Sequence, residues 1–498
     1  MIARRTLLLG AGAVFAAPAL LGRRAAAQGM MQGGMGGAAA TDPADLAAGE
    51  PFRPLPELDA RGGSLSLRAM SGQTRFAAGA PTPTLGFNRP YLGPTIRVRR
   101  GDAVAADVTN GTGNPVSTHW HGLNVPSDAD GGAPQSIIAP GTTWRATLPV
   151  EQPAATLWYH THVHGRNAPD VWAGLAGALI VEDVEEAALG LPSAADSDDL
   201  VLILQDKRLD AEGQGIYEPG MMDVMHGYLG DVVLVNGQFA PAAGVPQGPV
   251  RLRLINASTS ARHVVSFPRA TVLIGVDQGL LPAPVEVDTV TLAPGERAEV
   301  VTDMGEGGSA AIAVAASRMG GMMTGMMGMM GGADLSHTLL TLVADDDRPV
   351  AGRVPQDLTD GPAAMPEPVA ARRFVLQEMA GGMMGMSGMG GGGPVMGINA
   401  KPYDPAVIDF TARVGTVERW TVVAEAMVHP FHAHGVKFRI PEPARPEETG
   451  WKDVATIEGT RDLLVSIDAP SVGDVPFMFH CHILEHEDAG MMGQFLTA

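Results

Sequence analysis

The sequence predicts an all-β protein built from three related β-sandwich domains. Its 498 residues include 64 Gly and 39 Pro but only 18% charged residues, which favours turn-rich β structure over a helical or disordered chain. Apolar residues alternate with polar ones in three separate blocks, and each block closes on a second apolar stretch. At roughly 150 residues per domain, the length agrees with three such units.

Each block justifies one predicted domain. The first has Ile96 and Val98, a turn at 101–102, and Val104, Ala106 and Val108; the second has Val250, Leu252 and Leu254; the third has Val414, Val417 and Trp420. The closing stretches are 175–181, 339–343 and 495–496. This spacing predicts strands with one buried face. Polar or Ala/Pro-rich joints at 184–197 and 345–370 place the domains at 45–183, 197–345 and 371–498.

The first 27 residues read as an export signal. Arg4-Arg5 precede an apolar stretch at 6–22, and small residues follow at 25–27, which resembles a twin-arginine signal. A Sec signal is the next alternative. A membrane anchor is disfavoured, because the stretch is short and has Gly10, Gly12 and Pro18 inside it.

Charge and sulfur content narrow the function. A net charge of −20 repels nucleic acid and anionic membranes, so neither is an expected partner. The chain has 27 Met but a single Cys, which excludes an internal disulfide and leaves many soft thioether ligands. We therefore expect a metal site.

Eight of the 14 His occur as four His-x-His pairs. Residues i and i+2 of a strand project from one face, so each pair forms a two-pronged ligand set. Eight imidazoles exceed the needs of one metal and suit a cluster of about three ions, of copper, iron, nickel or zinc, held between the first and third domains. The pairs are His119/His121, His160/His162, His432/His434 and His480/His482. Of the other six, His429 and His486 belong with Cys481 to the pattern described next, His164 is expected to be structural, and His226, His263 and His337 are expected to be surface or core residues.

Cys481 predicts a second metal site. It must point to the opposite face from His480 and His482, and so bind a different ion. With His429, His486 and Met491 it provides two imidazoles, a thiolate and a thioether, the ligands of a blue-copper site; structural zinc would not call for the thioether. Electrons can pass from Cys481 along the backbone to the cluster, where several coppers can reduce dioxygen to water.

These motifs resemble those of the multicopper oxidases, most closely the bacterial periplasmic copper-efflux oxidases, which are cuprous oxidases of the laccase type. The resemblance runs from about residue 45 to the C-terminus and rests on His119-Trp120-His121-Gly122, Trp158-Tyr159-His160-Thr161-His162, His429-Pro430-Phe431-His432-Ala433-His434, His480-Cys481-His482 with His486 and Met491, and Gly450-Trp451-Lys452-Asp453. It implies three cupredoxin-like Greek-key domains, of which the middle one is a spacer, and four copper ions.

The resemblance also implies a division of the ligands. His429, Cys481, His486 and Met491 would hold the type 1 copper; His119 and His432 the type 2 copper; His121, His160, His162, His434, His480 and His482 the type 3 pair. Asp130 and Glu487 match two acids of the family and are candidate proton relays, because making water consumes protons. The alternatives are a turn residue for Asp130 and, for Glu487, a carboxylate that is either solvated or only supports a metal ligand.

Two Met-rich segments bear on the electron donor. Between 319 and 330, seven of twelve residues are Met, and six more lie in 379–396. The intervening Gly residues disfavour a helix, so we expect mobile loops. Thioether sulfur suits Cu(I), and by the resemblance Glu425 and Met427 would bind a substrate copper. Adaptable hydrophobic filler is the alternative role of the methionines.

Three functions remain open on the sequence. The first is a periplasmic cuprous oxidase that protects against Cu(I), uses dioxygen, and acts more weakly on phenols and aromatic amines. The second is a laccase with an organic donor, or an Fe(II) or Mn(II) oxidase. The third is a copper-binding or storage protein. We expect a monomer, because three domains in one chain already supply the interface that the cluster needs.

Overall fold

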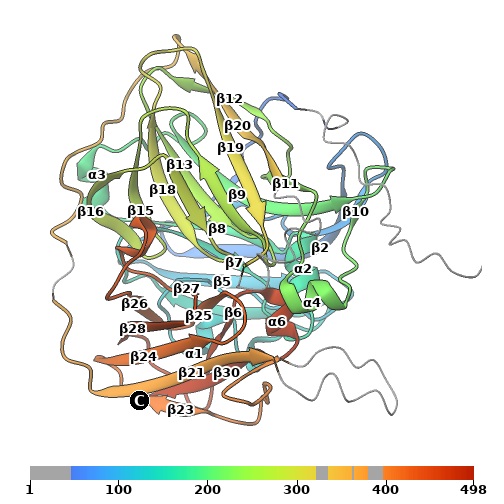
Figure 1. Cartoon of the computed structure of the whole chain (residues 1–498), viewed down its shortest axis with the longest axis vertical. Helices are drawn as coiled ribbons and strands as arrows, with labels where there is room; N and C mark the ends of the chain where they lie inside the picture. The colour runs from blue at the N-terminus through green and yellow to red at the C-terminus, as the bar shows by residue number, and fades with distance from the viewer. Residues whose placement is uncertain (1–45, 47, 321–334, 362–363, 379–395) are drawn as a thin grey trace, which may run out of the picture. The chain divides into compact units, whose positions relative to one another are not determined.

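The computed structural model describes residues 46, 48–320, 335–361, 364–378 and 396–498, all within one compact unit, Ala39–Ala498 (Figure 1). The predicted export signal and most of both Met-rich segments lie outside the described residues. Among the helices that are described, none is long and apolar enough to cross a membrane.

Six sheets form three consecutive pairs. The first pair consists of β1 (Glu57–Asp59), β4 (Thr95–Arg99), β8 (Ala176–Glu182) and β7 (Ala155–His160), and of β3 (Thr82–Phe87), β2 (Ser64–Thr74), β5 (Ala103–Asn110) and β6 (Thr143–Pro149). The second consists of β10 (Gly215–Ile216), β9 (Asp199–Leu209), β13 (Pro249–Asn256), β18 (Arg297–Asp303), β15 (Thr271–Val276) and β16 (Gly279–Glu286), with β11 (Val232–Val235) on β9, and of β12 (Ala242–Pro246), β20 (Leu335–Asp345), β19 (Ser309–Ser317), β14 (Arg262–Ser266) and β17 (Thr289–Leu292).

The third pair consists of β22 (Met396–Ile398), β21 (Ala370–Glu378), β24 (Thr416–Ala424), β28 (Thr460–Ile467) and β26 (Val436–Arg439), and of β23 (Phe410–Ala412), β30 (Met492–Thr497), β29 (Phe477–Cys481), β25 (His429–Ala433) and β27 (Val454–Ile457). Short helices connect the strands: α1 (Ser127–Asp130), α2 (Asn167–Ala173), α3 (Val184–Leu189), α4 (Met221–His226) and α6 (Leu484–Asp488), with 3₁₀ turns at Pro134–Ser136 and Pro446–Glu448.

The three pairs repeat one topology. In each, two strands pair in parallel: β2 with β5, β9 with β13, and β21 with β24. An antiparallel strand flanks the first member (β3, β11 or β22), and another flanks the second (β6, β18 or β28). The prediction of an all-β chain of three related sandwiches is confirmed. The predicted domain limits themselves stay predictions.

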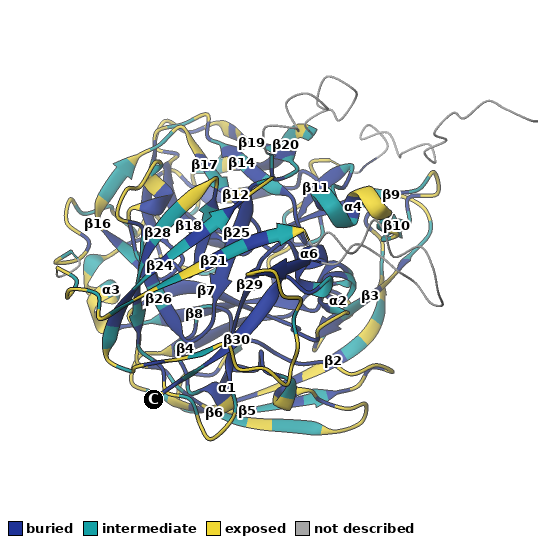
Figure 2. Cartoon of the chain, turned by 60° about the horizontal axis from the view of Figure 1, so that its bottom comes forward, coloured by how far each residue is buried: buried dark blue, intermediate teal, exposed yellow. Residues whose placement is uncertain are grey.

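Strand β13 departs from the predicted pattern. Val104, Ala106 and Val108 of β5 are buried and alternate with more exposed residues, as expected for one buried face. In β13, however, Arg251 and Arg253 on the other face are buried as well. They stay charged in the interior because they pair with Glu299 and Asp199 (Figure 2 shows this interior in dark blue).

Each pair of sheets encloses an apolar core. The first is formed by residues between Ala60 and Val181, and the second by residues between Leu200 and Leu342. The third core contains Trp420 and Phe431 together with Cys481 and Met491. Two of the predicted metal ligands are therefore built into the hydrophobic core of the C-terminal sheets.

Candidate metal centres

The His-x-His segments lie side by side in two places, although His121 lies in a turn and His162 and His482 just beyond the ends of β7 and β29. In the C-terminal sheets, β25 and β29 are antiparallel and His432 stands opposite His480. In the N-terminal sheets, His119 and His160 form the matching bridge, with N–H to O distances of 2.8 and 3.1 Å. All eight imidazoles of the four pairs are buried.

The eight rings converge on one another in three groups. The Nε2 atom of His480 lies 3.2 Å from Nε2 of both His162 and His434. His121 Nδ1 lies 3.4 Å from His160 Nε2, and the ring of His482 lies 5.1 and 5.7 Å from these two rings, centroid to centroid. The Nε2 atoms of His119 and His432 are 3.4 Å apart. The structure thus brings together the residues that the sequence predicts for the cluster.

Oxygen atoms hold the outward nitrogens of most of these rings. In five rings the outward nitrogen is Nδ1, and it donates to an oxygen atom. The five pairs are His119 to Asp130 O, His160 to Thr161 O, His432 to Asp453 O, His434 to Asp130 Oδ2, and His480 to Cys481 O. A neutral imidazole that donates through one nitrogen keeps a lone pair on the other. His121 is reversed: Nε2 donates to Asp453 Oδ1 at 3.1 Å, so Nδ1 faces the cluster.

The inward nitrogens fit a metal cluster. Burial, the largest cause, lowers the pKa of six of these rings: well below the usual value for His121, His160, His432 and His434, to about 4 for His162 and to about 3 for His482. They therefore face one another as neutral lone pairs in a dry interior, an arrangement that repels unless a cation binds it. Among the described residues, neither of the two buried ring nitrogens of His482 has a hydrogen-bond partner.

A second site surrounds Cys481. Its Sγ atom lies 3.4 Å from His429 Nδ1 and 3.7 Å from His486 Nδ1, and these two nitrogens are 3.3 Å apart. The other nitrogen of His486 donates to the carbonyl of Met225 on α4. Burial raises the pKa of the Cys481 thiol, so metal binding must displace a proton there. Met491 is buried in the same core, and its carbonyl accepts the Cys481 N–H at 3.1 Å.

Both predicted acids contact the outer edges of cluster histidines. Asp130, which ends α1, places Oδ2 2.8 Å from His434 Nδ1 and 3.3 Å from His119 Nδ1. Gly132 is required beside it, because a Cβ there would lie 2.4 Å from the His434 ring. Glu487 on α6 places Oε2 3.2 Å from His480 Nδ1 and accepts the amide of Asn167 through Oε1. Both carboxylates are buried.

Sequence reasoning gave no role to two residues beside the cluster, although Asp453 belongs to the Gly-Trp-Lys-Asp motif. Asp453 touches His121 through its carboxylate and His432 through its carbonyl. Arg297, at the start of β18 in the middle sheets, holds the Asp453 carboxylate through both terminal nitrogens. The middle part of the chain is therefore more than the spacer that the resemblance implied. The two charged residues at 452–453 stand beside apolar residues, a pattern that could have indicated a buried, functional Asp453. No sequence spacing links Asp453 to Arg297.

The described ends of both Met-rich segments lie beside the Cys481 site. The carbonyl of Gly320 accepts the N–H of Val428, which directly precedes His429. Met396 donates its N–H to the carbonyl of Ala489, between His486 and Met491. Of the two residues predicted for a substrate copper, Glu425 is exposed and Met427 packs half-buried against the third core. The methionines of 321–330 and 379–395 lie outside the described residues.

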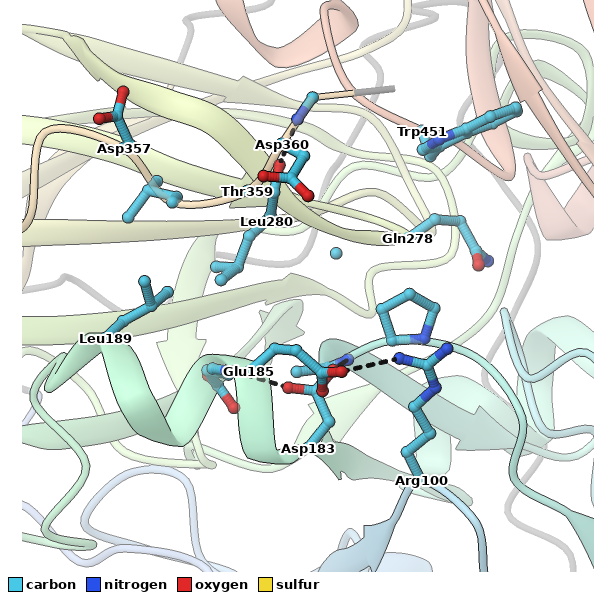
Figure 3. A pocket seen from close by; sticks show the side chains of 16 residues that line it. Arg100, Asp183, Glu185, Leu189, Gln278, Leu280, Asp357, Thr359, Asp360 and Trp451 are labelled. Carbon is cyan, nitrogen blue, oxygen red and sulfur yellow. Dashed lines mark hydrogen bonds and ion pairs between the residues drawn. The ribbon is translucent and has the colours of Figure 1, made fainter. Parts of the chain in front are cut away.

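A cavity of about 530 Å³ approaches the cluster from the middle sheets (Figure 3). Arg100, Glu185 and Trp451 are among the residues that line it. Gln278 also lines it, and its amide donates to Asp453 Oδ2 and to the carbonyl of Gly122. One residue of the cavity wall, Gln278, thus contacts an acid that touches two cluster histidines.

Comparisons with known proteins agree with this geometry. Family models described as multicopper oxidase match residues 69–186 and 369–498. The structure resembles a laccase-like multicopper oxidase CueO from Ochrobactrum sp. (36% identity, TM-score 0.79, 90% of this chain and 100% of that chain) and a multicopper oxidase of Campylobacter jejuni called a metallo-oxidase (27%, 0.78, 93% and 98%). Cell division protein FtsP of Yersinia pestis is 37% identical over 90% of this chain and 92% of its own. The chain belongs to the multicopper oxidase family.

Proposed function

We propose that this protein oxidises Cu(I), and more slowly phenols and aromatic amines, and passes the electrons to dioxygen, which is reduced to two waters. One observation carries the proposal: a site around Cys481 and a cluster of eight buried imidazoles are joined through the tripeptide His480-Cys481-His482. Bound copper would supply the one-electron steps and the reduction of dioxygen. The protein supplies the ligands, the protons and access for the donor.

We assign the four coppers as follows. His429, Cys481 and His486, whose ligand atoms lie close together, would hold the type 1 copper, with Met491 of the same core as the fourth ligand. His119 and His432 would hold the type 2 copper. The type 3 pair would take one trio each, His162 with His434 and His480, and His121 with His160 and His482.

The two buried acids would handle protons. Asp130 contacts imidazoles from both the type 2 and the type 3 sets, and Glu487 contacts His480. Each carboxylate can pass a proton toward the cluster without displacing a ligand. Replacing Asp130 by Asn, or Glu487 by Gln, should slow oxygen reduction and leave the visible absorption of the type 1 copper unchanged. Loss of that absorption instead would mean that these acids are structural.

The placement of the methionines supports Cu(I) as the donor. Both Met-rich segments begin or end against a loop that carries type 1 ligands, and soft thioethers suit Cu(I) in an oxidising compartment. With the export signal, this points to a periplasmic enzyme of copper tolerance, exported by the twin-arginine route and active as a monomer. Two similar proteins indicate the competing donors: the Ochrobactrum oxidase acts on lignin model compounds, and the Campylobacter protein is a metallo-oxidase.

Oxygen uptake separates these donors. We would compare Cu(I) with a dimethoxyphenol, each with and without added Cu(II). The test variant replaces the methionines of 321–330 and 379–395 by Leu, which conserves volume, and keeps Met319 and Met396 because both are buried. Met70→Leu on β2 is the control. Weakened Cu(I) oxidation with retained phenol oxidation supports the proposal; equal loss of both, or a fast phenol reaction without added copper, contradicts it.

The FtsP relatives favour a second candidate, a role in cell division. Several are 36–38% identical over about nine tenths of this chain. Deleting the gene and restoring it as wild type or as Cys481→Ser separates the two functions. Rescue of copper tolerance by the wild type only supports the oxidase. A division defect that both forms rescue equally supports a role that does not need the type 1 copper.

A further inference from the structure

We propose that Arg297 and Asp453 are positioning residues that fix which nitrogen His121 presents to the cluster, so that the middle part of the chain helps to build the site. The inference rests on the proposed function, since His121 is an assigned type 3 ligand. It explains why His121 presents Nδ1 to the cluster, whereas five other rings have Nδ1 hydrogen-bonded to an oxygen atom on the outside.

The turn of His121 is set by Asp453. His121 Nε2 donates to Asp453 Oδ1, which leaves Nδ1, 3.4 Å from His160 Nε2, as the metal-facing nitrogen. The backbone carbonyl of the same residue accepts His432 Nδ1 at 2.8 Å, so that His432 presents Nε2. One residue therefore orients two rings in opposite senses, one from each terminal part of the chain.

The Asp453 carboxylate has no freedom to rotate. Its Oδ1 accepts from Arg297 Nη1 at 2.5 Å and from His121, and its Oδ2 accepts from Arg297 Nη2 at 2.6 Å and from Gln278. These four hydrogen bonds use the roughly four lone-pair positions of a carboxylate. A rotated Asp453 would lose the two-point contact with the guanidinium.

Arg297 is fixed as completely. It is fully buried, and all five of its side-chain N–H groups have acceptors. Besides Asp453, these are the carbonyls of Thr156, Gly295 and Asp277. Thr156 lies on β7, the strand that ends at His160, so the guanidinium ties β7 and Asp453 to the middle sheets.

The chain leaves space for this pair at Gly122. A Cβ on Gly122 would lie 2.7 Å from Arg297 Nη2 and 2.7 Å from Asp453 Oδ2, and the residue has φ of +88°. Gly122 directly follows His121 in the His-Trp-His-Gly motif. Arg297 and Asp453 therefore approach the ligand segment closely at this glycine. Any side chain there would displace the carboxylate from His121.

A purely structural ion pair is the competing explanation, and the molecule contains a matched control. Arg253 in the middle sheets also binds its partner, Asp199, at two points, through Nε and Nη2 at 2.7 and 3.0 Å, and both residues are buried. Asp199 also pairs with Arg97, whereas Asp453 pairs with an imidazole. Lys keeps the charge but cannot form the planar fork, so Arg297→Lys and Arg253→Lys remove the two-point contact from both pairs.

The test loads each variant with copper and records copper per chain, the electron paramagnetic resonance spectrum and the unfolding temperature. We expect Arg297→Lys to bind cluster copper 10- to 100-fold more weakly, as for other residues that orient metal ligands, and to alter the type 2 spectrum. The type 1 signal is the internal reference and should persist. Arg253→Lys should lower the unfolding temperature and leave both signals unchanged.

Arg297→Lys with wild-type cluster copper and a wild-type type 2 spectrum would overturn the inference. If Arg297→Lys does not fold, Asp453→Asn decides by the same measurement, because Asn keeps the shape but weakens the charged contact. A wild-type chain that binds no copper would refute the proposed function instead, before any variant is compared.

Discussion

Mild acid should destabilise the copper-free protein far more than the copper-loaded one. Four fully buried imidazoles have strongly lowered pKa values, about 4 for His162 and His486 and about 3 for His482 and His263, mainly because burial disfavours the charged form. In the unfolded chain each returns to about 6.5. The unfolded state therefore binds more protons, and stability falls as the pH drops from about 6.5 toward 4.

The expected loss is large compared with the stability of a domain. At pH 5 an unfolded imidazole with a pKa of about 6.5 gains about 2 kcal/mol from protonation that the folded state cannot match, against about 0.2 kcal/mol at pH 7. Four such groups together lower the free energy of unfolding by about 7 kcal/mol between pH 7 and pH 5. Domains are typically stable by only about 5 to 15 kcal/mol.

Urea unfolding at pH 7, 6 and 5, with and without copper, measures this effect. The copper-free protein should lose most of its stability over this range, whereas bound copper occupies the ligand nitrogens and should protect the loaded protein. A copper-free protein whose unfolding midpoint does not change between pH 7 and 5 would refute the picture of neutral, buried imidazoles facing one another.

Three further predictions follow from single contacts. Cys481→Ser should remove one copper per chain together with the visible absorption of the type 1 site and abolish oxidation of every donor, while circular dichroism stays that of a folded β protein; retained turnover would contradict the assignment. Gly132→Ala should place a Cβ against the His434 ring and lower cluster copper, measured by mass spectrometry, whereas Gly113→Ala, where a Cβ meets open space and φ is likewise not positive, should not. Lys452→Met should cost about 3 to 5 kcal/mol in urea unfolding, because it removes the nearest cation from the buried carboxylates of Asp277 and Glu296, and a cost below 1 kcal/mol would contradict this.

The sequence was sufficient for features that depend on local periodicity. Alternation along 103–110 predicted β5, and the same rule placed Cys481 on the opposite face from His480 and His482. The His-x-His pairs predicted the cluster because spacing on a strand determines which side chains share a face. None of this required knowing which strands pair.

Features that depend on tertiary packing were not predictable in this way. Arg251 and Arg253 look like the solvent face of a strand until their buried partners are known. The choice between the two nitrogens of His121 depends on Asp453, which is 332 residues away. Arg297 and Asp453 come from different sheets and carry no spacing signal, so only the folded chain shows that they touch.

The stoichiometry of Cu(I) oxidation tests the central claim most directly. The copper-loaded protein would be supplied with Cu(I) while oxygen uptake and peroxide are followed together. The account predicts four Cu(I) oxidised per dioxygen over many turnovers, with no accumulation of peroxide. Uptake that stops after a fixed amount of copper per chain, or two Cu(I) per dioxygen with peroxide released, would contradict it.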